Sequence, residues 1–75
     1  MEGTLRKNEV GRWEIVDEDG DCSVELTCGD VFKIETERGM KKTRMEAWNK
    51  IYYAVGGYVL KEGLKAEWTR HPRMG

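Results

Sequence analysis

The chain has 75 residues, a formal net charge of −1 and 39% hydrophobic residues. A chain this short forms a single domain, whose core is too small to enclose a deep substrate cavity. Its near-neutral charge gives no overall attraction to nucleic acid or to membranes. No apolar run is long enough to span a membrane, and no signal-peptide core follows Met1, so we expect a cytoplasmic protein with no membrane partner.

Short alternating apolar runs separated by glycine-containing turns predict an all-β domain. Residues 3–7 are expected to form the first strand, with Leu5 facing inward. Residues 12–17 alternate in the same way, with Trp13 and Ile15 on one face. After them, Asp19-Gly20 is a strong signal for a two-residue hairpin turn.

Pairing across this turn can be worked out from the register. Ile15 then lies opposite Val24, and Trp13 lies opposite Leu26, so apolar side chains meet on one face. A shift by one residue would place each of them opposite a polar partner. On the other face the same register sets Glu14 opposite Glu25.

The stretch from Leu26 to Ile34 contains a Gly-Asp turn between two apolar segments. A three-residue loop over 28–30 would pair Leu26 with Phe32 and Val24 with Ile34. Gly29 is expected to supply the positive φ that such a loop needs. The Asp30 carboxylate is expected to accept hydrogen bonds from backbone amides in the turn.

The next turns are predicted at Arg38-Gly39 and over residues 48–50. The first would pair Ile34 with Thr43 and Phe32 with Met45 inside, and Glu35 with Lys42 outside. The second would pair Met45 with Tyr53.

Two further turns are predicted near the end of the chain. A hairpin at Gly56-Gly57 would pair Val55 with Tyr58 and Tyr53 with Leu60. A turn at Glu62-Gly63 would lead into a last strand, whose inward residues are Leu64, Ala66 and Trp68.

These segments give about six short antiparallel strands in meander order. A sheet this short, with one wet face, buries its apolar side by closing into a small barrel. We therefore expect one domain over 1–75, with its core over 3–68 and a flexible tail over 69–75. The turn residues expected to be structural are Gly20, Gly29, Asp30, Gly39, Gly56 and Gly57.

The sequence contains no recognisable catalytic or metal-binding constellation. The single histidine, His71, stands beside Pro72 in the expected tail, and no second base or metal ligand accompanies it. Cys22 and Cys28 are too far apart along one extended segment to form a disulfide, and we expect them to be thiols that pack in the interior. We therefore expect no enzymatic activity and no cofactor.

A set of motifs falls in order over most of the chain and resembles a known family. These motifs are Gly3-Thr4-Leu5, Arg12-Trp13-Glu14-Ile15, Leu26-x-x-Gly29-Asp30, Thr43-Arg44-Met45-Glu46, Tyr52-Tyr53-x-Val55-Gly56 and Gly63-Leu64-x-Ala66. They resemble small domains of unknown function from Gram-positive bacteria, often encoded on mobile elements. The resemblance covers about residues 3–68 and implies an SH3-like small barrel, with no activity attached. The chain departs from the family pattern at Met40, where relatives often carry an aromatic residue.

Two classes of function remain open for this small barrel. Trp13, Phe32, Tyr53 and Tyr58 are expected inside, whereas Trp48, Tyr52 and Trp68 either cover the barrel ends or form a binding surface. Basic residues concentrate in the second half of the chain. Residues 38–75 contain three acidic residues and nine basic residues, among them Arg70 and Arg73.

We expect a protein-binding accessory module of a mobile element, as a monomer or a weak homo-oligomer. The alternative is a nucleic-acid-binding barrel. The candidate surface comprises Lys41, Lys42, Arg44, Trp48, Tyr52 and Trp68.

Overall fold

The structure is a computed structural model that describes residues 1–68. Over this range the chain forms seven strands, which confirms the all-β class but gives one strand more than expected. The strands are β1 (Glu2–Lys7), β2 (Trp13–Asp17), β3 (Ser23–Glu25), β4 (Val31–Thr36), β5 (Gly39–Trp48), β6 (Ile51–Ala54) and β7 (Lys65–Trp68). The expected tail, with His71, Arg70 and Arg73, lies outside the described residues.

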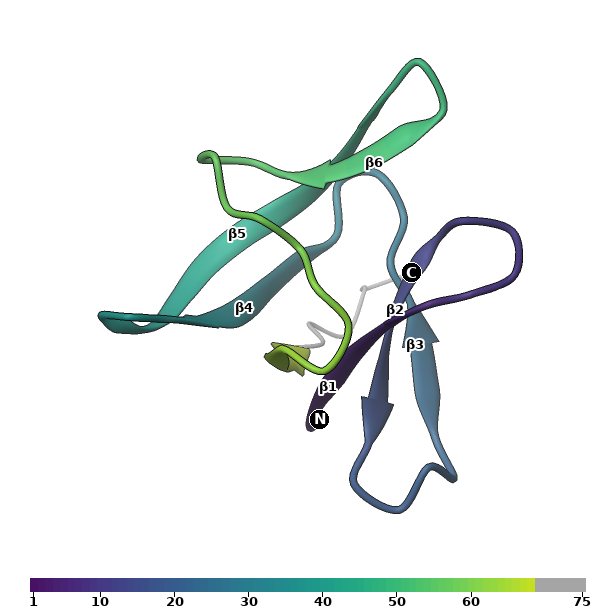
Figure 1. Ribbon diagram of the computed structural model, residues 1–75, viewed down its shortest axis with the longest axis vertical. Helices are drawn as coiled ribbons and strands as arrows, with labels where there is room; N and C mark the ends of the chain where they lie inside the picture. The colour runs from purple at the N-terminus through teal and green to yellow at the C-terminus, as the bar shows by residue number, and fades with distance from the viewer. Residues whose placement is uncertain (69–75) are drawn as a thin grey trace, which may run out of the picture.

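The strands form one antiparallel sheet in the order β3-β2-β1-β7-β4-β5-β6. The expected meander is wrong, because β7 returns from the end of the chain to lie between β1 and β4 (Figure 1). Its entry is fixed by backbone bonds, in which Gly63 donates to the Leu5 carbonyl and Leu5 donates to the Leu64 carbonyl. Over residues 1–68 the edge strands β3 and β6 do not pair with each other, so the sheet is open.

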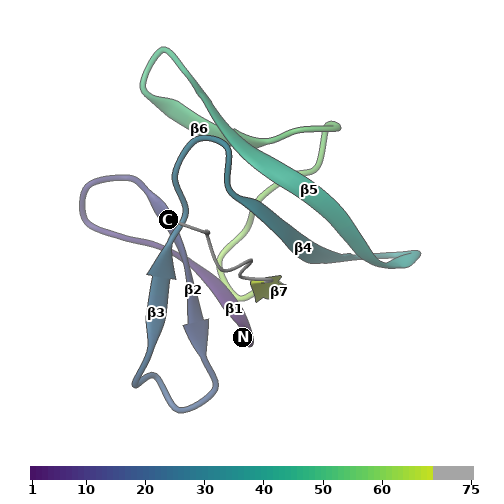
Figure 2. The same ribbon diagram turned by 180° about the vertical axis from the view of Figure 1, so that it is seen from behind.

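The sheet bends into two units that face each other across a shared core. Figures 1 and 2 show β1, β2 and β3 in one unit and β4, β5 and β6 in the other, with β7 joining them. Both units contribute to one apolar cluster: Leu5, Trp13, Ile15, Leu26, Phe32, Ile34, Met45, Ala54 and Ala66. The bend replaces barrel closure as the means of burying the apolar face.

The β2–β3 register matches the prediction. Ile15 lies opposite Val24, and Leu26 donates its N–H to the Trp13 carbonyl at 2.8 Å. Glu14 lies opposite Glu25, as expected. Each of these carboxylates has its own arginine partner, so the like-charge contact is relieved.

The predicted pairing of β3 with β4 is wrong, because the two strands diverge after Leu26. Thr27 to Asp30 form a tight turn, with the Asp30 N–H bonded to the Thr27 carbonyl and Gly29 at φ +91°. The Asp30 carboxylate accepts from the backbone N–H and the hydroxyl of Thr27 at 2.8 and 3.0 Å, which confirms its predicted capping role. Because Gly29 donates to the Met45 carbonyl, the turn sends β4 into the second unit.

The β4–β5 register differs from the prediction by two residues. The turn is Glu37-Arg38, so Phe32 lies opposite Thr43, Lys33 opposite Lys42 and Glu35 opposite Met40. The Thr36 hydroxyl stabilises this turn, since it accepts from Arg38 N–H and donates to the Gly39 carbonyl. A shift by two keeps each side chain on its predicted face, and Thr43 and Met45 are still buried.

The β5–β6 register differs by one residue, which reverses the faces of β6. The loop is Asn49-Lys50, and Met45 lies opposite Ala54 instead of Tyr53. Ala54 is therefore buried, while Tyr53 is exposed, contrary to its predicted inward position. The predicted hairpin at Gly56-Gly57 is also wrong, because only a single bridge, Ala54 to Tyr58, forms there.

Three further predictions concern the two cysteines, the turn glycines and the last strand. Cys22 and Cys28 are free thiols as expected, but both are exposed, so their predicted packing role is wrong. Both lie in exposed turns at the two ends of the edge strand β3, where no second layer covers them. The predicted turn glycines all have positive φ: Gly20, Gly29, Gly39, Gly56 and Gly57. Ala66 in β7 is buried, and Leu64, just before β7, and Trp68 pack against the core, which confirms their shared face.

Candidate protein-binding surface

The outer face of the β5–β6 hairpin carries a group of exposed apolar side chains. Trp48 lies directly opposite Ile51, and Tyr53 follows Ile51 by two residues on the same face. Their exposed fractions are 77%, 65% and 44%. Val55, 38% exposed, continues the row. We call Trp48, Ile51 and Tyr53 the hairpin patch.

The hairpin turn positions this patch. Asn49 and Lys50 both have positive φ, at 53° and 66°, which is the type I′ geometry of a tight two-residue loop. With this turn, Met45 and Ala54 point into the core and the alternate residues point outward. The hairpin tip projects away from β1, β2 and β3 in Figure 1, so the patch is open to solvent.

Two of the predicted basic residues lie on the same face as the patch. Lys42 and Arg44 alternate with inward-facing Thr43 along β5 and are exposed. Arg44 forms an ion pair with Glu46, at 2.6 Å between Nε and the carboxylate. Lys41 has the opposite parity, lies opposite Ile34 near the β4–β5 turn, and is exposed.

The other two predicted aromatics do not belong to this surface. Tyr52 and Trp68 are half-buried and pack against the core, on the inner face. The Arg12 guanidinium lies 5.3 Å from the centre of the Tyr52 ring. Its hydrogen bond to Glu25, followed by the charge interaction with Tyr52, raises the pKa of Arg12.

The sequence analysis missed Ile51 and misplaced Tyr53. The segment Ile51-Tyr52-Tyr53-Ala54-Val55 is apolar or aromatic at every position. Such a segment gives no alternation from which to choose the inner face. The available signal was the Asn at position 49, which favours a left-handed turn conformation and a two-residue loop.

Comparison with known protein families matches residues 3–68 to a domain of unknown function, DUF5348. The chain belongs to this family. Comparisons with curated proteins and with solved structures give no match. Membership in the DUF5348 family therefore carries no assigned activity, and the function has to be argued from the surface of the domain.

The two edges of the DUF5348 sheet differ in how they are protected. Edge strand β3 has three residues and presents Ser23 and Glu25 to solvent, features that discourage pairing with other chains. Edge strand β6 carries two residues of the hairpin patch, Ile51 and Tyr53. The β6 side of the domain is therefore the apolar and less protected one.

Neither a metal-binding cluster nor a membrane-spanning helix is present among the described residues of the DUF5348 domain. Among residues 1–68, no three His, Cys, Asp or Glu side chains are placed to hold a metal ion. This part of the chain also has no helix with the length and apolar character that a membrane crossing requires.

Proposed function

We propose that this domain is a non-enzymatic module that binds a protein partner through the hairpin patch. The observation that carries the proposal is the exposure of Trp48, Ile51 and Tyr53 side by side on one face. Scattered exposed apolar residues are common, but adjacent ones on a projecting hairpin are typical of interaction surfaces. Trp and Tyr are also the residue types that supply most binding energy at protein interfaces.

The chemistry of the surface indicates the kind of partner. The hairpin patch would dock against an apolar segment, while Lys42 and Arg44 beside it favour acidic side chains at the edge of the contact. Pairing along the free edge of β6 is a weaker option. The bridge from Ala54 to Tyr58 covers the end of this edge, so only the short stretch before Ala54 is open to another strand.

The proposal extends to the setting of the domain. The diverging turn at Gly29-Asp30 separates the two units, as the resemblance to SH3-like barrels implies, and it supports an SH3-like architecture that is open along one seam. The resemblance also supports a cytoplasmic accessory role on a mobile element of a Gram-positive bacterium. The two free, exposed thiols fit a reducing compartment.

Affinity capture with matched variants tests the proposal. Three versions of the domain are immobilised: the wild type, the double variant Trp48→Ala with Ile51→Ser, and the single variant Val10→Ser. The proteins captured by each version are quantified by mass spectrometry. Val10 is 76% exposed in a different loop and serves as the matched control. A direct partner should be captured by the wild type and the control, and be reduced about tenfold or more by the double change.

The capture result is then checked with purified components. Circular dichroism should show that all variants are folded, because exposed substitutions usually alter stability by about 0.5 kcal/mol or less. Titration calorimetry with the purified partner should reproduce the order of the variants. Capture that is unaffected by the double change would contradict the proposal.

A nucleic-acid partner is the second candidate, favoured by Lys42 and Arg44 sharing a face with Trp48. Stacking on Trp48 with phosphate contacts to the bases would suit a single strand. Fluorescence anisotropy with an oligonucleotide at about 50 mM salt tests it, since phosphate contacts weaken steeply with salt. No binding at that concentration would exclude this candidate.

A further inference from the structure

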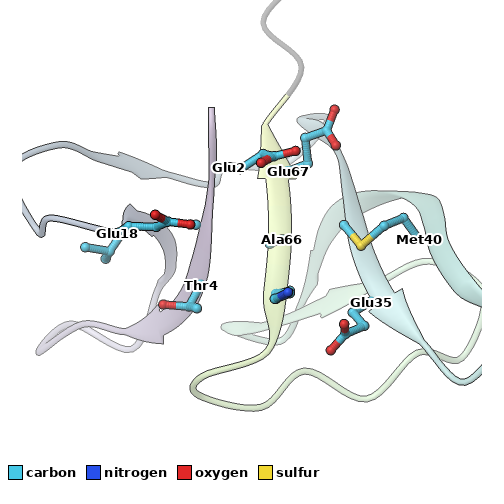
Figure 3. A pocket seen from close by; sticks show the side chains of 10 residues that line it. Glu2, Thr4, Glu18, Glu35, Met40, Ala66 and Glu67 are labelled. Carbon is cyan, nitrogen blue, oxygen red and sulfur yellow. The ribbon is translucent and has the colours of Figure 1, made fainter.

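A hollow of about 310 Å³ lies on the outer face of the sheet, over β1 and β7. Figure 3 shows Glu18 on one side of this hollow and Glu35 and Met40 on the other, with Glu2, Thr4 and Glu67 between them. Val16 also lines it and is only 8% exposed, although it points away from the core cluster. The end of β2 and the β2–β3 turn therefore border the hollow on one side, and strands β4 and β5 border it on the other.

Four charges form one row across the strands that border the hollow. The registers place Glu2 opposite Glu67, Glu67 opposite Lys33, and Lys33 opposite Lys42. The row therefore reads acid, acid, base, base from β1 to β5. Like charges directly opposite each other destabilise a sheet. The ion pairs found among the described residues, Arg6–Glu14, Arg12–Glu25 and Arg44–Glu46, relieve neither like-charge pair.

The neighbouring row on the same face has a related order. Thr4 lies opposite Lys65, and Glu35 lies opposite Met40. Extension of the β4–β7 register by one residue brings Lys65 opposite Glu35. This second row reads Thr4, Lys65, Glu35, Met40, so opposite charges stand at its centre and an apolar side chain stands at its β5 end.

We propose that this face binds a second copy of the same chain through a two-fold axis that runs along the strands between β7 and β4. This axis places each row of one copy against the same row of the other copy, running in the opposite order. Glu2 then faces Lys42 of the other copy, Glu67 faces Lys33, and Lys65 faces Glu35. Each of these three oppositions pairs an acid with a base, and each occurs twice, as a two-fold interface requires.

The shape of the face agrees with this arrangement. The same axis brings the β4–β5 wall of one copy over the hollow of the other. Met40, 41% exposed at the rim, enters the hollow beside Thr4 and above Val16. A general basic partner would neutralise Glu2 and Glu67 but would leave Lys33 and Lys42 facing each other. A second copy places an opposite charge against each member of both like-charge pairs.

This interface goes beyond the proposed function and uses a different surface. Met40 and Trp48 stand at opposite ends of β5, eight residues apart, or about 26 Å by strand rise. The contact is rich in charge and poor in apolar area, so the dimer is weak and dependent on salt. The hairpin patch stays free in the dimer to bind its own partner.

Analytical ultracentrifugation of the full chain with complementary charge reversals tests the proposal. The wild type should dimerise at 50 mM salt and lose about tenfold or more in affinity at 500 mM salt. Glu2→Lys alone and Lys42→Glu alone should each weaken self-association about tenfold or more, because each places like charges in both symmetric contacts. An equimolar mixture of the two variants should restore association to about the wild-type level, since every contact is again between opposite charges.

Further variants separate this interface from other modes of association. Met40→Ala should weaken the dimer, whereas Trp48→Ala should leave it unchanged, and circular dichroism confirms that each variant is folded. A monomeric wild type at about 1 mM protein and 50 mM salt would overturn the proposal. A dimer that tolerates both charge reversals, or that is lost with Trp48→Ala, would also overturn it. Neither result bears on partner capture by the hairpin patch.

Discussion

The two units of the sheet use their outer faces differently. In the unit of β1, β2 and β3, the part of the outer face near the β1–β2 turn is covered by charge pairs. Arg6 donates from Nε to Glu14 at 2.8 Å, and Glu14 is only 9% exposed. In the unit of β4, β5 and β6, the corresponding face leaves Trp48 and Ile51 largely in solvent. Around Arg6 and Glu14 the outer face pairs its own charges, whereas the hairpin patch exposes apolar side chains that no contact within residues 1–68 covers.

This contrast separates a charge-paired region that serves stability from an apolar region that offers a surface. Covering Glu14 with Arg6 contributes to folding and leaves little for a partner to bind. Exposing Trp48 and Ile51 contributes nothing to folding, since their apolar area stays in water. A protein retains such exposure at a cost in solubility when the surface has a binding role. Substitutions in the first unit should therefore affect stability, and those on the hairpin patch should affect binding.

The largest expected effect comes from Gly3, in the first unit. A Cβ atom at this position would lie 1.9 Å from the Val16 carbonyl oxygen. Both strands are held by their partners, so the backbone cannot withdraw easily. Gly3→Val should cost about 3 kcal/mol or more, or prevent folding. Urea denaturation followed by tryptophan fluorescence measures the change.

Gly29 provides the control for this substitution. Space around its position is open, and only its φ of +91° disfavours a side chain. Gly29→Ala should therefore cost about 1 to 2 kcal/mol, less than Gly3→Val. If Gly3→Val folded with a smaller loss than Gly29→Ala, the close approach of β1 and β2 would be contradicted.

The two units also differ in how well the sequence predicted them. In the first unit, apolar residues alternate cleanly with polar ones, and the register followed directly, with Ile15 opposite Val24. In the second unit, the hydrogen bond from Arg38 N–H to the Thr36 hydroxyl stabilises a turn at Glu37-Arg38, and the register is shifted by two residues from the prediction. A shift by two leaves each side chain on the same face, so the alternation of apolar residues cannot reveal it. The apolar run Ile51–Val55 left the faces of β6 undetermined, so Tyr53 was placed inside.

The errors therefore cluster where the surface departs from an ordinary half-buried sheet. Local alternation works when one face is buried and the other is wet. The hairpin patch breaks this rule, and rules of this kind tend to fail at functional sites. The position of β7 was also beyond local reasoning, because it depends on contacts between the first and last strands. Lys42 and Arg44 lie on the outer face, opposite in parity to Thr43 and Met45, because β5 kept its predicted parity, and Trp48 extends the same face.

A smaller effect, of opposite sign, is expected at the tip of the second unit. Lys50 has a φ of 66°, a left-handed conformation that costs an ordinary residue free energy. Lys50→Gly creates the Asn-Gly pair preferred in type I′ turns, and it should stabilise the domain by about 0.5 to 1 kcal/mol. The midpoint of urea denaturation measures this gain. A loss of stability would contradict the positive φ observed at Lys50.

The smallest effect separates the ion pairs of the two units. Arg6 and Glu14 are cross-strand partners, and the Glu14 side chain is 12% exposed, so water screens their interaction only in part. Arg44 and Glu46 lie on one strand and are 53% and 31% exposed. Double-mutant cycles to alanine should give a coupling of about 0.5 to 1 kcal/mol for the first pair and about 0.3 kcal/mol or less for the second. Both couplings should shrink in 1 M NaCl, the second almost to zero. Equal couplings in low salt would mean that the outer face of the first unit is no better protected from water than that of the second, and the distinction between a stabilising face and a binding face would fail there.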